Sequence, residues 1–191
     1  GDDREVLLAD PRELLADADA ENVPAEERAR RERAREGGSG VVSYSVDQAG
    51  RRVVFPINGQ LFLTEIREDG ISAHTRQLVL DDSMLSAGEY GPVLNPRISP
   101  DGRHVMYTTG RCLNLIDIAD WPAPGQAAQE SVTTVYGVDD DAAPTWKIGL
   151  AEFVAGEEMD RYDGFWWSPD SRYVLFETFD ASPEPIWHIC D

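Results

Sequence analysis

One segment of the chain occurs three times, and its second copy reads Ser99-Pro100-Asp101-Gly102-Arg103-His104-Val105-Met106-Tyr107. The first copy, Gly50-Arg51-Arg52-Val53-Val54-Phe55, aligns without gaps with the stretch from Gly102 to Tyr107 and precedes it by 52 residues. The third copy, Ser168-Pro169-Asp170-Ser171-Arg172-Tyr173-Val174-Leu175-Phe176, follows the second after 69 residues. Self-similarity at such intervals indicates a repeat architecture.

The composition of the repeat indicates short β-strands. The second and third copies begin with a turn, in which Pro fixes φ and the following residues accept the turn geometry, and every copy continues into an apolar strand. A repeat of about 40 to 50 residues with four short strands makes one blade of a β-propeller. The sequence therefore predicts a mainly β fold, an incomplete β-propeller of about three blades over residues 41–191. Ser99 and Ser168 are expected to have a structural rather than a catalytic role.

Residues 1–40 follow a different pattern and predict an N-terminal helical segment. Pro11 opens a short first helix, and a second helix is expected from Pro24 to Gly37. Proline suits the first helical position and glycine the position after the last turn. Because no large apolar residue lies between Pro24 and Gly37, this helix is expected to be held by partners or to present polar side chains.

The interval between the second and third copies is 17 residues longer than the first interval. The surplus falls in the region that holds residues 149–163, where the apolar residues Leu150, Phe153 and Val154 have helical spacing. We expect a short helix inserted between blades, at a point where function is often added to a repeat. The double tryptophan that follows, Trp166 and Trp167, should point to opposite faces of a strand, one into the core and one toward the next blade or the inserted helix.

The inserted segment reads Gly149-Leu150-Ala151-Glu152-Phe153-Val154-Ala155-Gly156-Glu157-Glu158-Met159-Asp160-Arg161-Tyr162 and resembles the double-glutamate segment of dipeptidyl peptidase IV. In that family two adjacent glutamates bind the free amino group of a peptide, and the resemblance assigns this role to Glu157 and Glu158. An ammonium group has three donors, which two carboxylates can accept as charge-assisted hydrogen bonds. The alternative interpretation is a solvated acidic helix.

A second run, Arg31-Glu32-Arg33-Ala34-Arg35-Glu36-Gly37-Gly38-Ser39-Gly40-Val41-Val42-Ser43-Tyr44, resembles the arginine-bearing helix of the cytosolic relatives in this family. The resemblance implies that Arg35 reaches the carbonyl group of the bound dipeptide, a task that suits the rigid fork of a guanidinium. Ala34 and Glu36 depart from the family pattern, which has a basic and an apolar residue there. The alternative is a solvated basic helix face.

Composition limits the partners. Lys+Arg total 17 against 36 Asp+Glu, which gives a formal net charge of -19, so we expect no nucleic acid partner. No apolar run approaches the roughly 18 residues of a membrane span, and no charged-then-apolar leader opens the chain. The expected location is cytoplasmic, and the alternative is that the complete protein is exported. The scattered histidines His74, His104 and His188 predict no metal site, and no cofactor is expected. Cys112 and Cys190, in strand-like apolar runs, are expected to be reduced buried thiols.

The chain is thus expected to be the N-terminal propeller part of a bacterial dipeptidyl aminopeptidase that resembles dipeptidyl peptidase IV. The resemblance implies that the complete protein has an α/β-hydrolase domain with a Ser-Asp-His triad, which this chain lacks, so the chain alone should be inactive. Its expected ligands are peptides with a free amino terminus. Unpaired sheet edges also predict a possible homo-oligomer. The alternative function is a non-catalytic β-propeller that binds other proteins.

Overall fold

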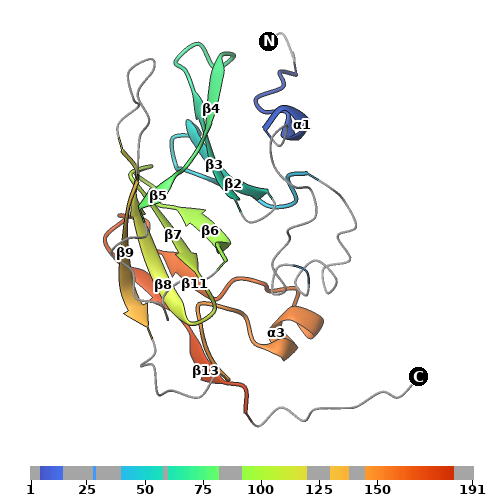
Figure 1. Ribbon diagram of the computed structural model, residues 1–191, viewed down its shortest axis with the longest axis vertical. Helices are drawn as coiled ribbons and strands as arrows, with labels where there is room; N and C mark the ends of the chain where they lie inside the picture. Colours follow the sequence, from blue (N-terminus) through green and yellow to red (C-terminus); the bar gives the residue numbers. More distant parts are fainter. Residues whose placement is uncertain are drawn as a thin grey trace, which may run out of the picture.

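The computed structural model describes residues 5–14, 28, 40–57, 60–81, 92–119, 130–137 and 145–182. Over these residues the fold is mainly β, with one four-stranded, one five-stranded and two two-stranded sheets (Figure 1). All strand pairs are antiparallel except one, and the described strands form no closed ring. The mainly β prediction is confirmed, whereas the incomplete propeller stays a prediction.

The first sheet consists of four consecutive strands that follow one another as hairpins. They are β1 (Ser45–Val46), β2 (Arg52–Ile57), β3 (Gln60–Ile66) and β4 (Ala73–Gln77), in the order β1-β2-β3-β4. β2 and β3 are buried over most of their length because both faces are covered. On one side Phe55 stacks on Phe62, and Ala9 and Leu14 from the N-terminal segment pack against them.

The second sheet has the order β5-β9-β8-β7-β6. Its strands are β5 (Leu80–Asp81), β6 (Leu94–Ile98), β7 (His104–Thr108), β8 (Cys112–Asp117) and β9 (Glu130–Gly137). The first strand, β5, pairs with β9 in parallel. One apolar core joins the two larger sheets, with residues from both: Val54, Leu61, Leu63, Leu78, Ile98, Val105, Tyr107, Ile116 and Val132.

Two small sheets complete the described fold. β10 (Trp146–Ile148) pairs with β13 (Thr178–Asp180), and β11 (Phe165–Trp167) pairs with β12 (Val174–Phe176). A second core, formed by Met106, Leu113, Ile148 and Phe165, attaches these sheets to β7 and β8. The helices whose bounds fall among the described residues are α1 (Pro11–Leu14) and α3 (Phe153–Glu158). The predicted first helix is therefore present, and the expected helix from Pro24 to Gly37 falls almost wholly outside the described residues.

The three copies of the repeat share one turn geometry. Asp47, Ser99 and Ser168 occupy equivalent positions, since each donates its N–H to the carbonyl five residues later and each carbonyl accepts from the N–H three residues later. Their side chains also cap the turns. The Asp47 carboxylate accepts from the backbone N–H of Arg51 and Arg52, and the Ser99 and Ser168 hydroxyls accept from the N–H at the start of the next strand segment. Ser99 and Ser168 therefore have the structural role predicted for them.

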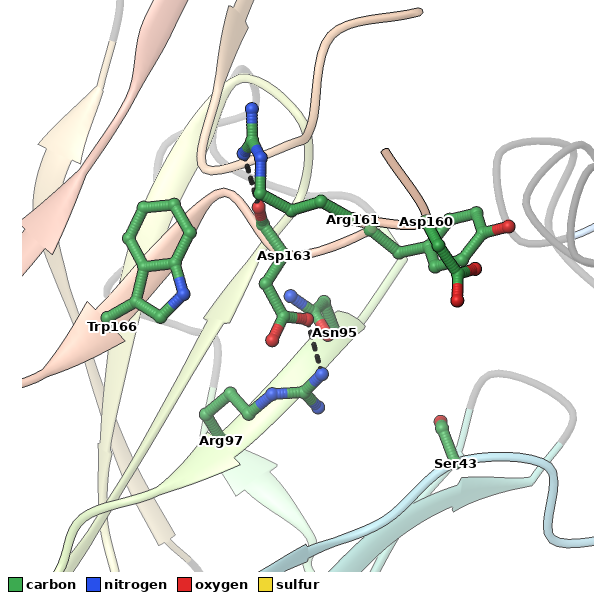
Figure 2. Close-up of a pocket in the computed structure, with 8 residues that line it drawn as sticks. Ser43, Asn95, Arg97, Asp160, Arg161, Asp163 and Trp166 are labelled. Atoms are coloured by element: carbon green, nitrogen blue, oxygen red, sulfur yellow. Dashed lines mark hydrogen bonds and ion pairs between the residues drawn. The ribbon is translucent and has the colours of Figure 1, made fainter. Parts of the chain in front are cut away.

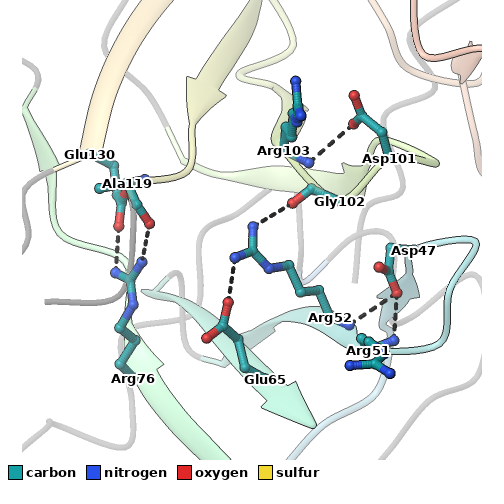
Figure 3. A network of polar contacts seen from close by, with 10 residues as sticks. All are labelled: Asp47, Arg51, Arg52, Glu65, Arg76, Asp101, Gly102, Arg103, Ala119 and Glu130. Atoms are coloured by element: carbon teal, nitrogen blue, oxygen red, sulfur yellow. Dashed lines mark hydrogen bonds and ion pairs between the residues drawn. The ribbon is translucent and has the colours of Figure 1, made fainter. Parts of the chain in front are cut away.

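Neighbouring turns are bonded to one another. The Gln48 N–H donates to the Pro100 carbonyl at 3.0 Å, and the Asp101 N–H donates to the Ser171 hydroxyl at 2.9 Å. Arg52 extends from the first turn, pairs with Glu65 at 2.5 Å and donates to the Gly102 carbonyl at 2.8 Å (Figure 3). The repeated turns thus form a row that connects the first sheet to the second and the second sheet to β11.

A buried ion pair joins the two larger sheets at another point. The Arg76 guanidinium on β4 pairs with the Glu130 carboxylate on β9, as Figure 3 shows. Glu130 is fully buried, and its second oxygen accepts from the Ala119 N–H at 2.5 Å. Because a buried charge without a partner is costly, this pair fixes the position of β4 relative to β9.

The prediction that both cysteines are buried thiols can be checked for one of them. Cys112 is a reduced thiol buried on β8, as the apolar run around it predicted. Cys190 lies outside the described residues.

Gly102→Ala should destabilise the protein more than Gly50→Ala, its counterpart in the first turn. Both glycines have positive φ, +74° and +66°, so alanine is strained at either position. A Cβ at Gly102 would also lie 3.0 Å from Asp47 Oδ2 and 3.4 Å from Arg52 Cδ, whereas nothing lies within 4 Å at Gly50. We expect a loss of about 1 kcal/mol for Gly50→Ala and about 2–3 kcal/mol for Gly102→Ala in urea unfolding. Equal losses would contradict the proposed packing of the two turns.

Candidate functional site

The segment between β10 and β11 is a loop whose two ends are held together. Leu150 and Asp163 form an antiparallel bridge, and the next residue, Gly164, lies directly against the same backbone. A Cβ at Gly164 would lie 2.4 Å from the carbonyl carbon of Gly149 and 2.4 Å from the nitrogen of Leu150. Only glycine permits this approach, so the loop begins and ends at one fixed point.

The loop carries α3, whose start and end have identifiable causes. Glu152 is the N-cap, and its carboxylate accepts from the N–H of Val154 at 2.8 Å and of Ala155 at 2.6 Å. At the other end the Ala155 carbonyl accepts from the N–H of Met159 and of Arg161, which turns the chain away from the helix axis. The short inserted helix expected from the sequence is therefore present.

The buried residues of α3 are not its large apolar ones. Phe153 and Val154, whose spacing predicted the helix, are 53% and 48% exposed. The buried residues are Ala155 and Gly156. A helix of six residues has fewer than two turns. Here its two smallest residues are the ones that face the protein, and Gly156 lies next to the Tyr162 ring.

Glu157 and Glu158 form the last turn of α3, and both are exposed. Among the described residues neither carboxylate makes a hydrogen bond or an ion pair, so both remain available to a ligand. The pair does not line the pocket described below. Arg35 lies outside the described residues, so its position relative to the pair stays a prediction.

A pocket of about 360 Å³ lies beside the end of α3 (Figure 2). Its lining comes from three parts of the chain: Ser43 before β1, Asn95 and Arg97 on β6, and residues 160–163 together with Trp166. Arg97 pairs with Asp163 at 2.5 Å, which connects β6 to the base of the loop. The pocket is thus bounded by the residues before β1, by β6 of the second sheet, and by the inserted segment with the start of β11.

Arg161 closes one side of this pocket. Its guanidinium pairs with Glu177 at 2.9 Å, donates to the Asp163 carbonyl at 2.8 Å and lies over the Trp166 ring, 5.7 Å from its centroid. The hydrogen bond with Glu177 raises the pKa of Arg161, so the cation is held firmly charged. This one side chain therefore orders the connection from the loop to β11.

The double tryptophan divides as the sequence predicted. The Trp167 side chain packs against the second core and donates its indole N–H to the Arg97 carbonyl at 3.0 Å. Trp166 is 38% exposed and lines the pocket. One ring therefore belongs to the scaffold and the other faces the candidate site.

Sequence reasoning missed the contribution of β6. Arg97 and Asn95 precede the inserted segment by more than 50 residues, and neither belongs to a motif. The one available signal was the positive charge of Arg97 just before a repeated turn, which does not reveal its partner. Residues 160–162 stood in the quoted segment, but their place in a pocket depends on the tertiary structure.

Comparison with known proteins gives the family. A family model described as the dipeptidyl peptidase IV (DPP IV) N-terminal region matches residues 35–191. The chain therefore belongs to the dipeptidyl peptidase IV family. It is similar to dipeptidyl peptidase 8 of Homo sapiens, with 24% identity over 178 residues that cover 86% of this chain and 18% of the relative. The chain thus spans less than a fifth of the length of that relative.

The described helices were compared with the requirements for a membrane span. No helix in the described part of the chain combines the length and the apolar composition that crossing a bilayer requires.

Gly164→Ala should displace the loop that carries α3. Because the new Cβ would overlap backbone atoms, which cannot rotate away, we expect a loss of about 3 kcal/mol or more in urea unfolding of the purified protein. Gly156→Ala is the matched control, since a Cβ there would meet only Tyr162 at 3.9 Å and alanine favours a helix. Unchanged stability of Gly164→Ala would show that the loop ends are not in this close contact.

Proposed function

We propose that this chain is the substrate-recognition part of a serine dipeptidyl peptidase that releases dipeptides from the amino terminus of peptides. In this proposal Glu157 and Glu158 hold the free amino group. One observation carries this proposal: two adjacent carboxylates at the end of α3 are exposed and have no partner among the described residues. The loop that holds α3 is closed at its base. Membership in the dipeptidyl peptidase IV family supports the same assignment.

The chemistry suits an ammonium ligand. Two neighbouring carboxylates repel each other, and an ammonium group between them relieves that repulsion while donating up to three hydrogen bonds. Each charge-assisted bond contributes about 1.5–3 kcal/mol in favourable geometry. A peptide with an acetylated amino terminus offers neither the charge nor the donors, so the pair selects free amino termini and fixes how far along the peptide the reacting bond lies.

Further parts of the proposal lie outside the described residues or outside the chain. Arg35 orients the carbonyl group of the bound dipeptide, as the resemblance of residues 31–44 implies. The antiparallel sheets are blades of an incomplete propeller. An α/β-hydrolase domain elsewhere in the complete protein supplies the Ser-Asp-His triad, and the chain alone does not hydrolyse peptides.

Glu158→Gln in the complete protein should lower kcat/KM for dipeptidyl substrates by about 10- to 150-fold, because an amide replaces one charged acceptor. The measurement compares substrates with a free and an acetylated amino terminus. Glu68→Gln is the matched control, since it makes the same change in charge at an exposed glutamate on another part of the protein.

The outcomes separate the two functions considered for this chain. A large loss with Glu158→Gln and none with Glu68→Gln supports the peptidase. An unchanged kcat/KM of Glu158→Gln removes the anchor role. Absence of cleavage of any free dipeptidyl substrate by the complete protein favours the non-catalytic protein-binding module.

A further inference from the structure

Glu177, between β12 and β13, bonds to both ends of the inserted loop through its backbone. Its N–H donates to the Gly164 carbonyl at 2.9 Å, and its carbonyl accepts from the Gly149 N–H at 2.9 Å. Gly149 precedes and Gly164 follows the segment 150–163. One residue outside the loop therefore connects the two ends of the segment that carries α3.

The Glu177 side chain extends this connection into the loop. Its carboxylate accepts from the Arg161 guanidinium at 2.9 Å, and the same guanidinium nitrogen donates to the Asp163 carbonyl at 2.8 Å, a bond that Figure 2 shows. The backbone N–H of Arg161 donates to the Ala155 carbonyl of α3 at 3.0 Å. A continuous path of bonds thus runs from Glu177 through Arg161 to α3, where it ends two residues before Glu157.

The pair of Arg161 and Glu177 is only half-buried, and Glu177 does not line the pocket beside α3. The two side chains are 33% and 29% exposed. Ion pairs with this much access to water add little to the stability of a fold, because water screens the charges and two long side chains lose freedom. The pair is therefore better suited to fixing the position of the loop than to holding the fold together.

Release of a dipeptide requires a fixed position of α3. Two residues of an extended peptide span about 7 Å, so a pair that holds the amino terminus selects the second peptide bond only if its distance from the nucleophile is constant. A displacement of about 1 Å can lower the rate of a reaction by about 100-fold although the substrate still binds. A residue that fixes α3 can therefore affect the reaction without contacting the peptide.

We propose that Glu177 is a positioning residue which, acting through Arg161, holds α3 where the reacting bond of a peptide bound at Glu157 and Glu158 meets the nucleophile. This inference rests on the proposed function, because it assigns the ammonium group of the peptide to that pair. Glu177 contacts neither the peptide nor the reacting atoms in this account.

Glu177→Met in the complete protein tests the inference. Methionine keeps the length of the side chain but removes the carboxylate, so Arg161 loses its partner while the backbone bonds of residue 177 remain. We expect kcat for dipeptidyl substrates with a free amino terminus to fall about tenfold, whereas KM stays within about twofold because the glutamate pair still binds the ammonium group. Glu177→Gln keeps an oxygen that can accept from Arg161 and should retain more of kcat than Glu177→Met.

Glu65→Met is the matched control, because it breaks a pair of similar exposure in the first sheet. Glu65 pairs with Arg52 at 2.5 Å, and its side chain is 23% exposed. We expect similar small shifts of the urea midpoint for Glu65→Met and Glu177→Met, and unchanged kcat and KM for Glu65→Met. If Glu177 had only a structural role, the two variants would behave alike in the kinetic measurements as well.

Each outcome decides the matter. An unchanged kcat of Glu177→Met, a rise in KM at constant kcat, or an equal loss of kcat in Glu65→Met overturns the inference. Glu158→Gln, measured in the same assays, tests the proposed function separately. If Glu158→Gln lowers kcat/KM and Glu177→Met does not, the proposed function stands and the positioning role fails. If Glu158→Gln has no effect, the proposed function fails and the inference fails with it.

Discussion

Two backbone segments touch where Gly164 meets Gly149 and Leu150, at a distance that leaves no room for a side chain. This contact closes the inserted loop at its base, and the bridge between Leu150 and Asp163 continues it. Every residue of functional interest in the described part of this loop, from the glutamate pair to Trp166, lies within the closed segment or directly after it. One steric constraint therefore closes the loop at its base.

The rest of the fold holds that unit in place. The row of repeated turns and the buried pair of Arg76 and Glu130 fix the first two sheets relative to each other, and the pair of Arg97 and Asp163 fixes the loop to the second sheet. Because a binding site loses specificity when its groups can shift, such connections support a site built from separate segments. The pocket beside α3 is one consequence, since its walls come from β6, from the loop and from the residues before β1.

Features that depend on local sequence were predictable. The turns at Ser99 and Ser168, the short inserted helix and the opposite directions of Trp166 and Trp167 follow from turn chemistry and strand periodicity. The helical spacing of Phe153 and Val154 did not reveal that both are exposed on α3, because a helix this short is positioned by its ends rather than by an apolar stripe. The parallel pairing of β5 with β9 and the approach of Asn95 to the loop depend on long-range packing, for which the sequence has no local signal.

The central claim is that the fixed loop presents Glu157 and Glu158 to the amino terminus of a peptide. A crystal structure of the complete protein with a bound dipeptide such as Ala-Pro tests it most directly. The account predicts an ammonium nitrogen within about 3 Å of a carboxylate oxygen of each glutamate, with α3 held against Tyr162 as in the free protein. An ordered dipeptide whose ammonium group is directed away from both glutamates would contradict it.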